Sequence, residues 1–280
     1  MITRIKNITY VATIFLLTQQ FISCQKNSNL EGNGINSSSV DNNINALPVD
    51  SSLVAWYPFH HGHLVDKSIY NNRIVFCSAT PVVSRSGQDS GAYYFDGTSS
   101  YMAVKNSSSL NPASFVTLAA LIKPMGFYQG KCHGNRVFNK GFNDADHGRI
   151  LLGFDDEPYL NNGCNKPVHN NREFFVGSYG NGGAKASGAR DTDRIRTDTW
   201  YNLVYTYDGS TAKLYINGIL KPNVKVRTSF KPNDMPLYIG RMQDPAFPYY
   251  FNGVIDEIRI YNRALSSDEV IGLNSLMGRD

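Results

Sequence analysis

The chain has 280 residues, which allows one large domain or two small ones and is enough to bury a sizeable core. Only 18% of the residues are charged and 12% are aromatic, with 24 Gly and 17 Tyr. This composition disfavours coiled coils and helical bundles, which are rich in Ala, Glu, Lys and Leu. The net charge of +4 falls to +2 (4 − 2) without Arg4 and Lys6, so charge does not indicate a nucleic-acid partner.

Residues 1–23 predict a secretory signal peptide. Two basic residues precede an uncharged, mostly apolar run over 8–17, and a helix of that length rises only about 15 Å, half of a bilayer core. The run ends in Phe21-Ile-Ser-Cys24, which resembles a bacterial lipobox, although Phe21 stands where such boxes usually carry Leu. We therefore expect the chain to be exported and anchored to the bacterial envelope through an acylated Cys24; the alternative is a plain signal peptide with an incidental cysteine.

Residues 24–50 are expected to form a flexible tether. Seven Asn, four Ser and no aromatic residue follow Cys24 within this segment. Such a segment cannot bury enough apolar surface to offset the entropy lost on ordering. As a coil it would hold the next domain, residues 51–280, roughly 30 Å from the anchor on average. Which membrane leaflet carries the anchor stays open.

From residue 53 onward the sequence predicts short strands separated by turns. The expected strands include 53–59, 92–95, 114–122, 202–207, 212–216, 237–239 and 254–261. Asp208-Gly-Ser210 predicts a three-residue hairpin loop, and Asn217-Gly218 predicts a second reversal of the chain. In the last strand, strict alternation would place Ile255 on the same face as Glu257, and Ile258 on the opposite face.

One short helix is expected near the end of the chain. Ser266 and Glu269 have the spacing of a capping box, and Val270, Leu273 and Leu276 follow at helical spacing. Turn signals elsewhere recur too often for α/β units. The sequence therefore predicts one all-β sandwich with a short C-terminal helix.

Several motifs in this chain look like successive signatures of the laminin-G-like, concanavalin-A-like jelly-roll family. They are Leu53-Val-Ala-Trp-Tyr-Pro-Phe59, Tyr94-Phe-Asp-Gly97, Trp200-Tyr-Asn-Leu-Val-Tyr-Thr-Tyr-Asp-Gly209, Leu237-Tyr-Ile-Gly-Arg241 and Phe251-Asn-Gly-Val-Ile-Asp-Glu-Ile-Arg-Ile-Tyr-Asn-Arg-Ala-Leu265. The resemblance covers 51–275. It implies two curved antiparallel sheets with the first and last long strands as neighbours, and binding, commonly of glycans, more often than catalysis. The chain departs from the family at Ser100, where many members carry Asp.

Three cysteines remain after Cys24, an odd number for an oxidising compartment. If 136–140, 149–154 and 173–178 are consecutive antiparallel strands, the segment before the first and the loop between the last two lie at one end of the sheet. This order predicts a disulfide between Cys132 and Cys164, with a stabilisation of roughly 3–4 kcal/mol in the chain-entropy model. Cys77 is expected to be a buried free thiol; pairings through Cys77 are the alternative.

Catalysis is not supported by the sequence. Retaining hydrolases of this fold need two carboxylic acids at i and i+4 on one strand, with an acid between them, so that the carboxyl groups are about 5–5.5 Å apart. No Glu after the leader has another Glu four residues away. We therefore assign no catalytic residue, and a glycoside hydrolase is the least favoured function.

A calcium site is implied only by the resemblance, through Asp96 of the Phe-Asp-Gly turn and Asp256. Calcium prefers carboxylate and carbonyl oxygens. The alternative is that Asp96 caps its turn and Asp256 joins a surface ion pair. His60, His61 and His63 could indicate zinc, but no Cys or acid lies at ligand spacing, so a solvated loop is the favoured interpretation.

Glycan recognition would need aromatic platforms and planar polar groups at one edge of the sandwich or on its concave face. The candidates near the predicted disulfide are Phe127, Tyr128, Tyr159, Asn161, Asn162, Asn165 and Arg172. Any single Tyr could instead serve packing, and a second aromatic patch, Phe247-Pro-Tyr-Tyr250, competes with this set. The sequence therefore favours an envelope-displayed module that binds a glycan or polysaccharide; the alternative is a protein-interaction, adhesion or structural module that binds a cell-surface protein.

Overall fold

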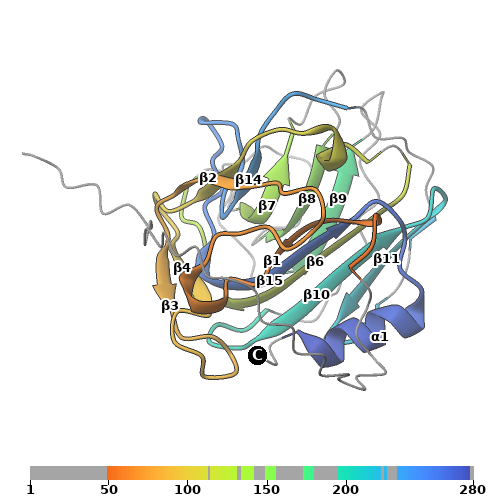
Figure 1. Ribbon diagram of the computed structural model, residues 1–280. Helices are drawn as coiled ribbons and strands as arrows, with labels where there is room; N and C mark the ends of the chain where they lie inside the picture. Colours follow the sequence, from red (N-terminus) through yellow and green to blue (C-terminus); the bar gives the residue numbers. More distant parts are fainter. Residues whose placement is uncertain are drawn as a thin grey trace, which may run out of the picture.

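Two antiparallel β-sheets lie face to face, with a short helix at the outside of one of them (Figure 1). This arrangement is seen in a computed structural model, which describes residues 49–112, 114–130, 134–141, 149–155, 173–179, 195–221, 224–225 and 232–277. The predicted two-sheet jelly-roll sandwich is confirmed. No helix among these residues combines the length and the apolar composition that a bilayer crossing requires.

Sheet A is the larger of the two sheets and runs in the order β12-β11-β10-β6-β15-β4-β3, with β1 also pairing with β15 and β13 with β11. Its strands are β1 (Leu53–Tyr57), β3 (Thr80–Val82), β4 (Ala92–Asp96), β6 (Val116–Pro124), β10 (Tyr201–Tyr207), β11 (Thr211–Ile216), β12 (Ile219–Leu220), β13 (Val224–Lys225) and β15 (Asn252–Tyr261). The first and last long strands, β1 and β15, are antiparallel neighbours, as the family resemblance implied.

Sheet B runs in the order β2-β5-β14-β7-β8-β9. Its strands are β2 (Ile74–Cys77), β5 (Met102–Val104), β7 (Gly134–Lys140), β8 (Arg149–Asp155), β9 (Glu173–Tyr179) and β14 (Leu237–Ile239). The three consecutive antiparallel strands predicted between 136 and 178 are therefore confirmed. Two 3-10 turns, His60–Gly62 and Ser108–Leu110, lie between strands.

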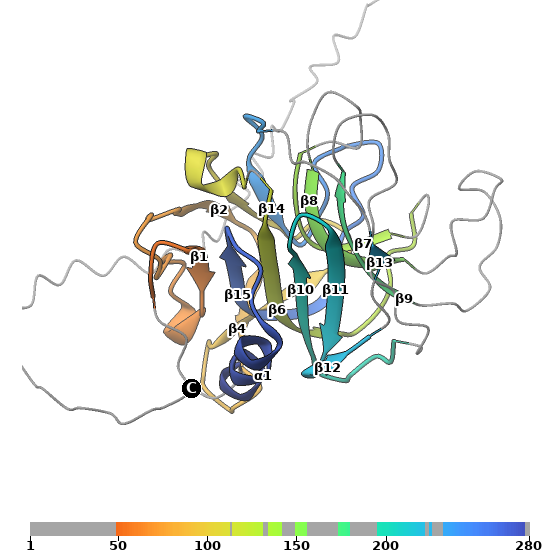
Figure 2. The same cartoon turned by 90° about the vertical axis from the view of Figure 1, so that its right-hand side faces the viewer.

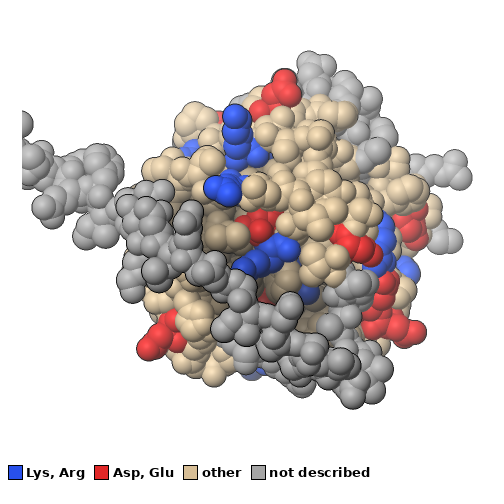
Figure 3. Space-filling model, viewed as in Figure 1, with Lys and Arg blue, Asp and Glu red and all other residues tan. Residues whose placement is uncertain are grey.

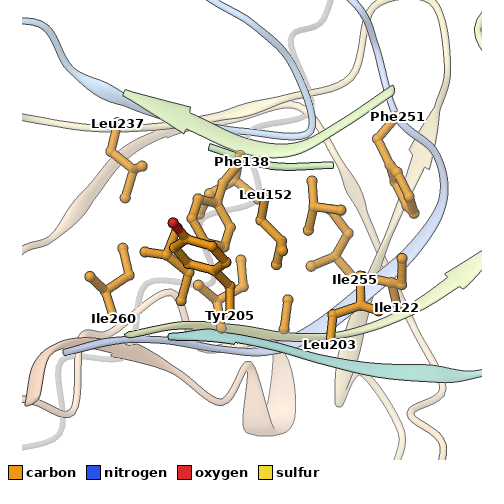
Figure 4. Packing of buried hydrophobic residues seen from close by; sticks show 14 of the residues in the cluster. Ile122, Phe138, Leu152, Leu203, Tyr205, Leu237, Phe251, Ile255 and Ile260 are labelled. Carbon is orange, nitrogen blue, oxygen red and sulfur yellow. The ribbon is translucent and has the colours of Figure 1, made fainter. Parts of the chain in front are cut away.

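One large apolar core fills the space between the sheets, because alternate residues of each strand face inward. On β6, Leu118 and Ile122 face this core, whereas Leu121 between them faces the outer side. Figure 4 shows Leu237, Phe138 and Leu152 of sheet B opposite Leu203, Tyr205, Ile122 and Ile260 of sheet A. Burying one such side chain stabilises the fold by about 1.5–3 kcal/mol.

The helix α1 (Ser267–Leu276) covers the outer face of sheet A (Figures 1 and 2). Its Val270 and Leu273 pack in one cluster with Leu121 of β6 and Tyr215 of β11. The predicted capping box is present: the Ser266 side chain accepts from the backbone N–H of Glu269, whose carboxylate accepts from the Ser266 N–H. The cap and the apolar spacing both came from the local sequence, which is why this element was predictable.

The two hairpin reversals were also predicted correctly. The carboxylate of Asp208 accepts hydrogen bonds from the backbone N–H groups of Ser210 and Thr211, which closes the loop between β10 and β11. Asn217 and Gly218 both have positive φ, 53° and 79°, which the tight turn between β11 and β12 requires.

The last long strand departs from the strict alternation expected from its sequence. Both Ile255 and Ile258 face the core, because a β-bulge shifts the pairing of β15 with β6 between Asp256 and Arg259. Glu257 lies in this bulge with a φ of 49°, in the left-handed region. The prediction that placed these two isoleucines on opposite faces is therefore wrong, since the bulge adds one residue between them.

Candidate functional site

The residues predicted for ligand binding fall into two groups. Phe127 and Tyr128 are described by the structure, whereas the others lie outside the described residues, as do both cysteines of the predicted disulfide. Those others are Tyr159, Asn161, Asn162, Asn165 and Arg172. The prediction for Phe127 needs correction: its ring is buried in the core and meets the ring of Phe154 edge to face at 5.9 Å. It offers no face to a ligand.

Tyr128 is half-buried and joins the second aromatic patch that the sequence offered as a competitor. Its ring lies 6.1 Å from that of Tyr249 and 6.4 Å from that of Tyr250. Its backbone N–H donates to Oδ1 of Asn135 on β7. Burial raises the pKa of the Tyr128 hydroxyl, and the Tyr250 hydroxyl adds to this effect. Tyr128 and the second aromatic patch therefore form one cluster.

This cluster continues across the outer face of sheet B as a row of aromatic side chains. We use the name aromatic row for Phe76, Tyr101, Tyr238, Tyr250 and Tyr128, together with Arg241 among them. Phe76 is 43% exposed, and the other members are half-buried. The row is thus a surface that water and ligands can reach.

Strand register explains how these residues, far apart in the sequence, meet. On β14, Leu237 and Ile239 face the core, so Tyr238 between them faces outward. In the pairing, Ala103 of β5 lies opposite both Phe76 of β2 and Tyr238. Neighbouring strands are about 4.8 Å apart, a spacing that brings outward rings into contact.

The contacts along the aromatic row run from ring to ring, except between Tyr238 and Tyr250, which are joined through Arg241. Phe76 stacks on Tyr101 with the centroids 4.6 Å apart, and Tyr101 meets Tyr238 edge to face at 5.7 Å. The guanidinium of Arg241 lies 4.9 Å from the Tyr101 ring, 5.3 Å from the Tyr238 ring and 5.2 Å from the Tyr250 ring. Each such pair contributes about 0.5–1.5 kcal/mol beyond its buried area.

The loop between β14 and β15 holds one end of the row in place. The Phe251 N–H donates to the Gly240 carbonyl oxygen, and the Met242 N–H donates to the Pro248 carbonyl oxygen. Gly240 has a φ of 82°, and a Cβ on it would lie 2.2 Å from Cδ1 of Phe95. Only glycine fits here, so the backbone that carries Arg241 outward is tightly determined.

The two carboxylates considered for calcium do not form one site. Asp96 lies opposite Asn252, and Asp256 is four residues (256 − 252) farther along β15, about 13 Å away along the strand. The Asp96 carboxylate accepts from the backbone N–H groups of Thr98, Ser99 and Ser100. Burial raises the pKa of Asp96, but these bonds and one from the Ser99 hydroxyl outweigh it, so the pKa lies well below its usual value. These positions do not fit a Ca²⁺ ion shared by both acids.

The histidines also do not gather a zinc set in the described part of the chain, where no three of His, Cys, Asp and Glu cluster. His61 and His63 are exposed, and Nε2 of His60 lies 3.9 Å from Oε1 of Glu257. Cys77 is present as a half-buried thiol whose Sγ lies 3.6 Å from the Ala79 carbonyl oxygen.

A buried polar cluster, separate from the aromatic row, surrounds the β-bulge of β15 in sheet A. Glu257 is 3% exposed and Arg259 is 7% exposed, and Nε of Arg259 donates to Oε2 of Glu257 at 3.1 Å. The same oxygen accepts from Nε1 of Trp56 at 3.0 Å, and the Arg259 guanidinium lies 4.2 Å from the Trp56 ring. Because Oε2 of Glu257 accepts from Trp56 of β1 and from Arg259 of β15, this carboxylate links the two strands.

The fold is that of a two-sheet antiparallel β-sandwich of the laminin-G-like class. Residues 96–271 match the laminin G family described as the concanavalin A-like lectin/glucanases superfamily, so the chain belongs to that family. In sequence, 75 residues are 36% identical to human adhesion G-protein coupled receptor D1, which is 25% of this chain and 8% of the receptor. The chain therefore spans only a small part of that relative's length.

Solved structures similar to this chain share its fold. Domain 4 of AbnA, a GH43 extracellular arabinanase from Geobacillus stearothermophilus, was solved with arabinotriose; it is 20% identical with a TM-score of 0.52, over 80% of this chain and 98% of that one. The binding domain of Paraclostridial Mosquitocidal Protein 1 is 16% identical with a TM-score of 0.57, over 81% and 52%. The botulinum neurotoxin serotype D binding domain is 16% identical with a TM-score of 0.56, over 80% and 51%.

Most of the aromatic row was missed by sequence reasoning. Tyr128 was identified, but Phe76, Tyr101, Tyr238 and Arg241 were not. The one local signal was the alternation in Leu237-Tyr-Ile239, which marks Tyr238 as the outward residue of a strand. The neighbours of that strand come from distant parts of the chain, and only the topology reveals them.

Proposed function

We propose that this protein is a glycan-binding module whose ligand lies on the aromatic row of sheet B. The observation that carries the proposal is the unbroken contact of exposed and half-buried rings from β2, from Tyr101 just before β5, and from β14. Aromatic faces accept the apolar C–H side of a sugar ring, while tyrosine hydroxyls and a guanidinium can bond its hydroxyl groups. Because the row lies on a sheet and a hydrogen-bonded loop, little ordering entropy is lost on binding.

The comparisons support binding at a coarser level. The domain of the arabinanase was solved with a trisaccharide, and the two toxin relatives are binding domains. We propose binding without hydrolysis, since the paired carboxylates of a retaining glycosidase are missing from the sequence. Incubating the bound polysaccharide with the protein should release no new reducing ends. Their release would show that the protein is a hydrolase.

We also propose that the domain is displayed on the bacterial envelope through a lipid on Cys24. This proposal rests on the short apolar run, the lipobox-like end and the Asn-rich tether of the sequence. Cys24→Ser should move the protein from the membrane fraction to the soluble fraction and abolish incorporation of labelled fatty acid. Unchanged membrane retention would contradict the lipid anchor without affecting the glycan proposal.

A protein partner is the second candidate function, and the exposed apolar edge beside the row favours it. Val75 is 66% exposed and Phe76 is 43% exposed on β2, which is the last strand of sheet B in the described part of the chain. Exposed apolar patches often mark protein contacts. A partner of this kind would contact the β2 edge.

A glycan array probed with the full chain, with and without Ca²⁺, tests the proposal. Tyr101→Ala combined with Tyr238→Ala should weaken binding about ten-fold or more, because both central rings are lost. Phe115→Ala is the matched control, since Phe115 is an exposed aromatic (49%) beside sheet A. If the double variant has the wild-type unfolding temperature and binds glycans unchanged, the glycan site does not lie on the aromatic row. Phe76→Ser is a milder second variant of the same row.

A further inference from the structure

We propose that Arg241 makes the aromatic row selective for acidic saccharides, with a sugar carboxylate, as in uronic acids, bound by its guanidinium. The inference rests on the proposed function, since it concerns the ligand class of the same surface. It follows from the position of Arg241, from its hydrogen bonds and from the lack of an acidic partner for it among the residues that the structure describes.

The guanidinium is held in one orientation by its surroundings. Nε donates to the carbonyl oxygen of Met242 at 2.8 Å, and Nη1 donates to the hydroxyl of Tyr250 at 3.3 Å. Three tyrosine rings within 5.3 Å flank its planar group. The side chain therefore loses little further entropy when it binds. Among the described residues no partner takes the N–H groups of Nη2 or the second N–H of Nη1, so these donors are left to a ligand.

No carboxylate neutralises Arg241 among the residues that the structure describes. Two arginines elsewhere in the fold do have an acid: Arg259 bonds Glu257 at 3.1 Å and Arg263 bonds Glu269 at 2.6 Å. In the described part of the chain, Arg241 donates to neutral acceptors, the Met242 carbonyl oxygen and the Tyr250 hydroxyl. A guanidinium that is aligned but unneutralised is suited to a carboxylate, which it binds through two parallel hydrogen bonds.

The contrast with Arg136 separates a structural arginine from a ligand-facing one. Arg136 also stacks on a tyrosine, with its guanidinium 4.5 Å from the Tyr249 ring, but it is 1% exposed. Its Nη1 donates to the Phe154 carbonyl oxygen inside the fold. Arg241 has the same ring chemistry at the surface, where an external anion can reach it.

The charge distribution favours a sparsely charged carboxylate ligand over a densely sulfated or phosphorylated one. The row itself contains one cation, Arg241. On the face drawn in Figure 3, Lys and Arg lie in separate groups with Asp and Glu among them, so no continuous array of cations is seen there. Polyanions with several charges per repeat are bound by arrays of cations. One guanidinium between aromatic rings is suited to one acidic sugar among neutral contacts.

Matched polymers that differ only in the acid test this inference. The full chain is titrated with polygalacturonate and its methyl ester, and with hyaluronan and its carboxyl-reduced form. Binding to at least one acidic member should be about ten- to a hundred-fold tighter than to its neutral form, the range for hydrogen bonds to a charged group. Arg241→Met and Arg241→Lys should both reduce this ratio toward one, since lysine lacks the planar fork.

Arg85→Met is the matched control, because Arg85 is an exposed arginine between β3 and β4, two strands of sheet A, and is not part of the aromatic row. It should leave the ratio unchanged, and added salt should lower the wild-type ratio. Equal binding of acidic and neutral forms, or tighter binding of heparin than of any carboxylate polymer, would overturn the inference and leave the glycan proposal standing. Binding to no glycan on the array or in these pairs would overturn the proposed function itself.

Discussion

The indole Nε1 of Trp56 donates a hydrogen bond of 3.0 Å to Oε2 of Glu257, a residue 201 positions later in the chain. Trp56 belongs to β1 and Glu257 to the bulge of β15, and their strands are paired. On the same side of β15, the residues before the bulge, Asn252 to Ile255, pair with β4 instead of β1. The Trp56–Glu257 bond therefore joins the first and last long strands of the domain, near the position where the pairing of β15 changes from β4 to β1.

Loss of the Glu257 carboxylate should destabilise the domain strongly. Glu257→Ala leaves Arg259, 7% exposed, without its counter-charge, which costs about 3–5 kcal/mol for a buried pair. Trp56→Phe keeps the ring beside Arg259 and removes one donor, so we expect a smaller cost of about 1.5–3 kcal/mol. Urea unfolding measures both. A change below about 1 kcal/mol for Glu257→Ala would show that the bond is incidental.

Acid should weaken the cap of α1. The side-chain hydrogen bond from Arg263 lowers the pKa of Glu269 to about 2, with a further contribution from the Ser266 N–H. A carboxylate with a lowered folded-state pKa stabilises the fold above its unfolded pKa of about 4.5, and this contribution is lost as the pH falls toward 2. Unfolding free energies between pH 5 and pH 2 should therefore converge for wild type and Glu269→Gln. A constant difference between the two across this range would contradict the assignment.

Alkaline pH should act in the opposite direction through Lys140. Burial lowers the pKa of this ammonium to about 8, although Asp234 partly opposes the shift. Its Nζ donates to Oδ1 of Asn111 and to both oxygens of Asn233. Since the unfolded lysine keeps its proton up to about pH 10.5, the unfolded state binds more protons above pH 8, and wild-type stability should rise with pH there.

Lys140→Met removes this titration. The stability of wild type relative to the variant should increase between pH 8 and pH 10, as followed by denaturant unfolding at fixed ionic strength. Parallel curves for the two proteins over this interval would mean that Lys140 titrates normally in the folded state.

The sandwich was predictable because its signals are local. Apolar alternation, the turn at Asn217-Gly218 and the capping box at Ser266 each act over a few residues, and each is found as expected. The face of the residues beyond Glu257 was not predictable, because a bulge with a non-glycine residue at positive φ leaves no pattern in a single sequence. The β5 strand, only Met102–Val104, was too short to be recognised.

The binding surface was harder to predict, for a physical reason. Tyr238 and Phe76 contact Tyr101 from strands that are far apart in the chain, and pairing through β5 brings them together. Tyr128 was found because it lies in an aromatic stretch beside other candidates. Phe127 was misassigned because neighbouring residues in an extended segment face opposite sides, and its side is the core.

The predicted disulfide between Cys132 and Cys164 can now be tested on a firmer basis. The strand pairing places Gly134 opposite Asp155, and Asp155 opposite Glu173. The start of β7, the end of β8 and the start of β9, from which the chain leads to the two cysteines, are therefore neighbours. Peptide mapping under non-reducing conditions should link the two cysteines and leave Cys77 as a thiol. A peptide joining Cys77 to either of the others would contradict this pairing.

A crystal structure of the complex with the oligosaccharide that binds best on the array would test the location of the glycan site most directly. We expect a sugar ring stacked on Tyr101 or Tyr238, with a polar group of the next sugar within hydrogen-bond distance of Arg241. An oligosaccharide bound on sheet A, or at a loop end of the sandwich away from these residues, would contradict the account.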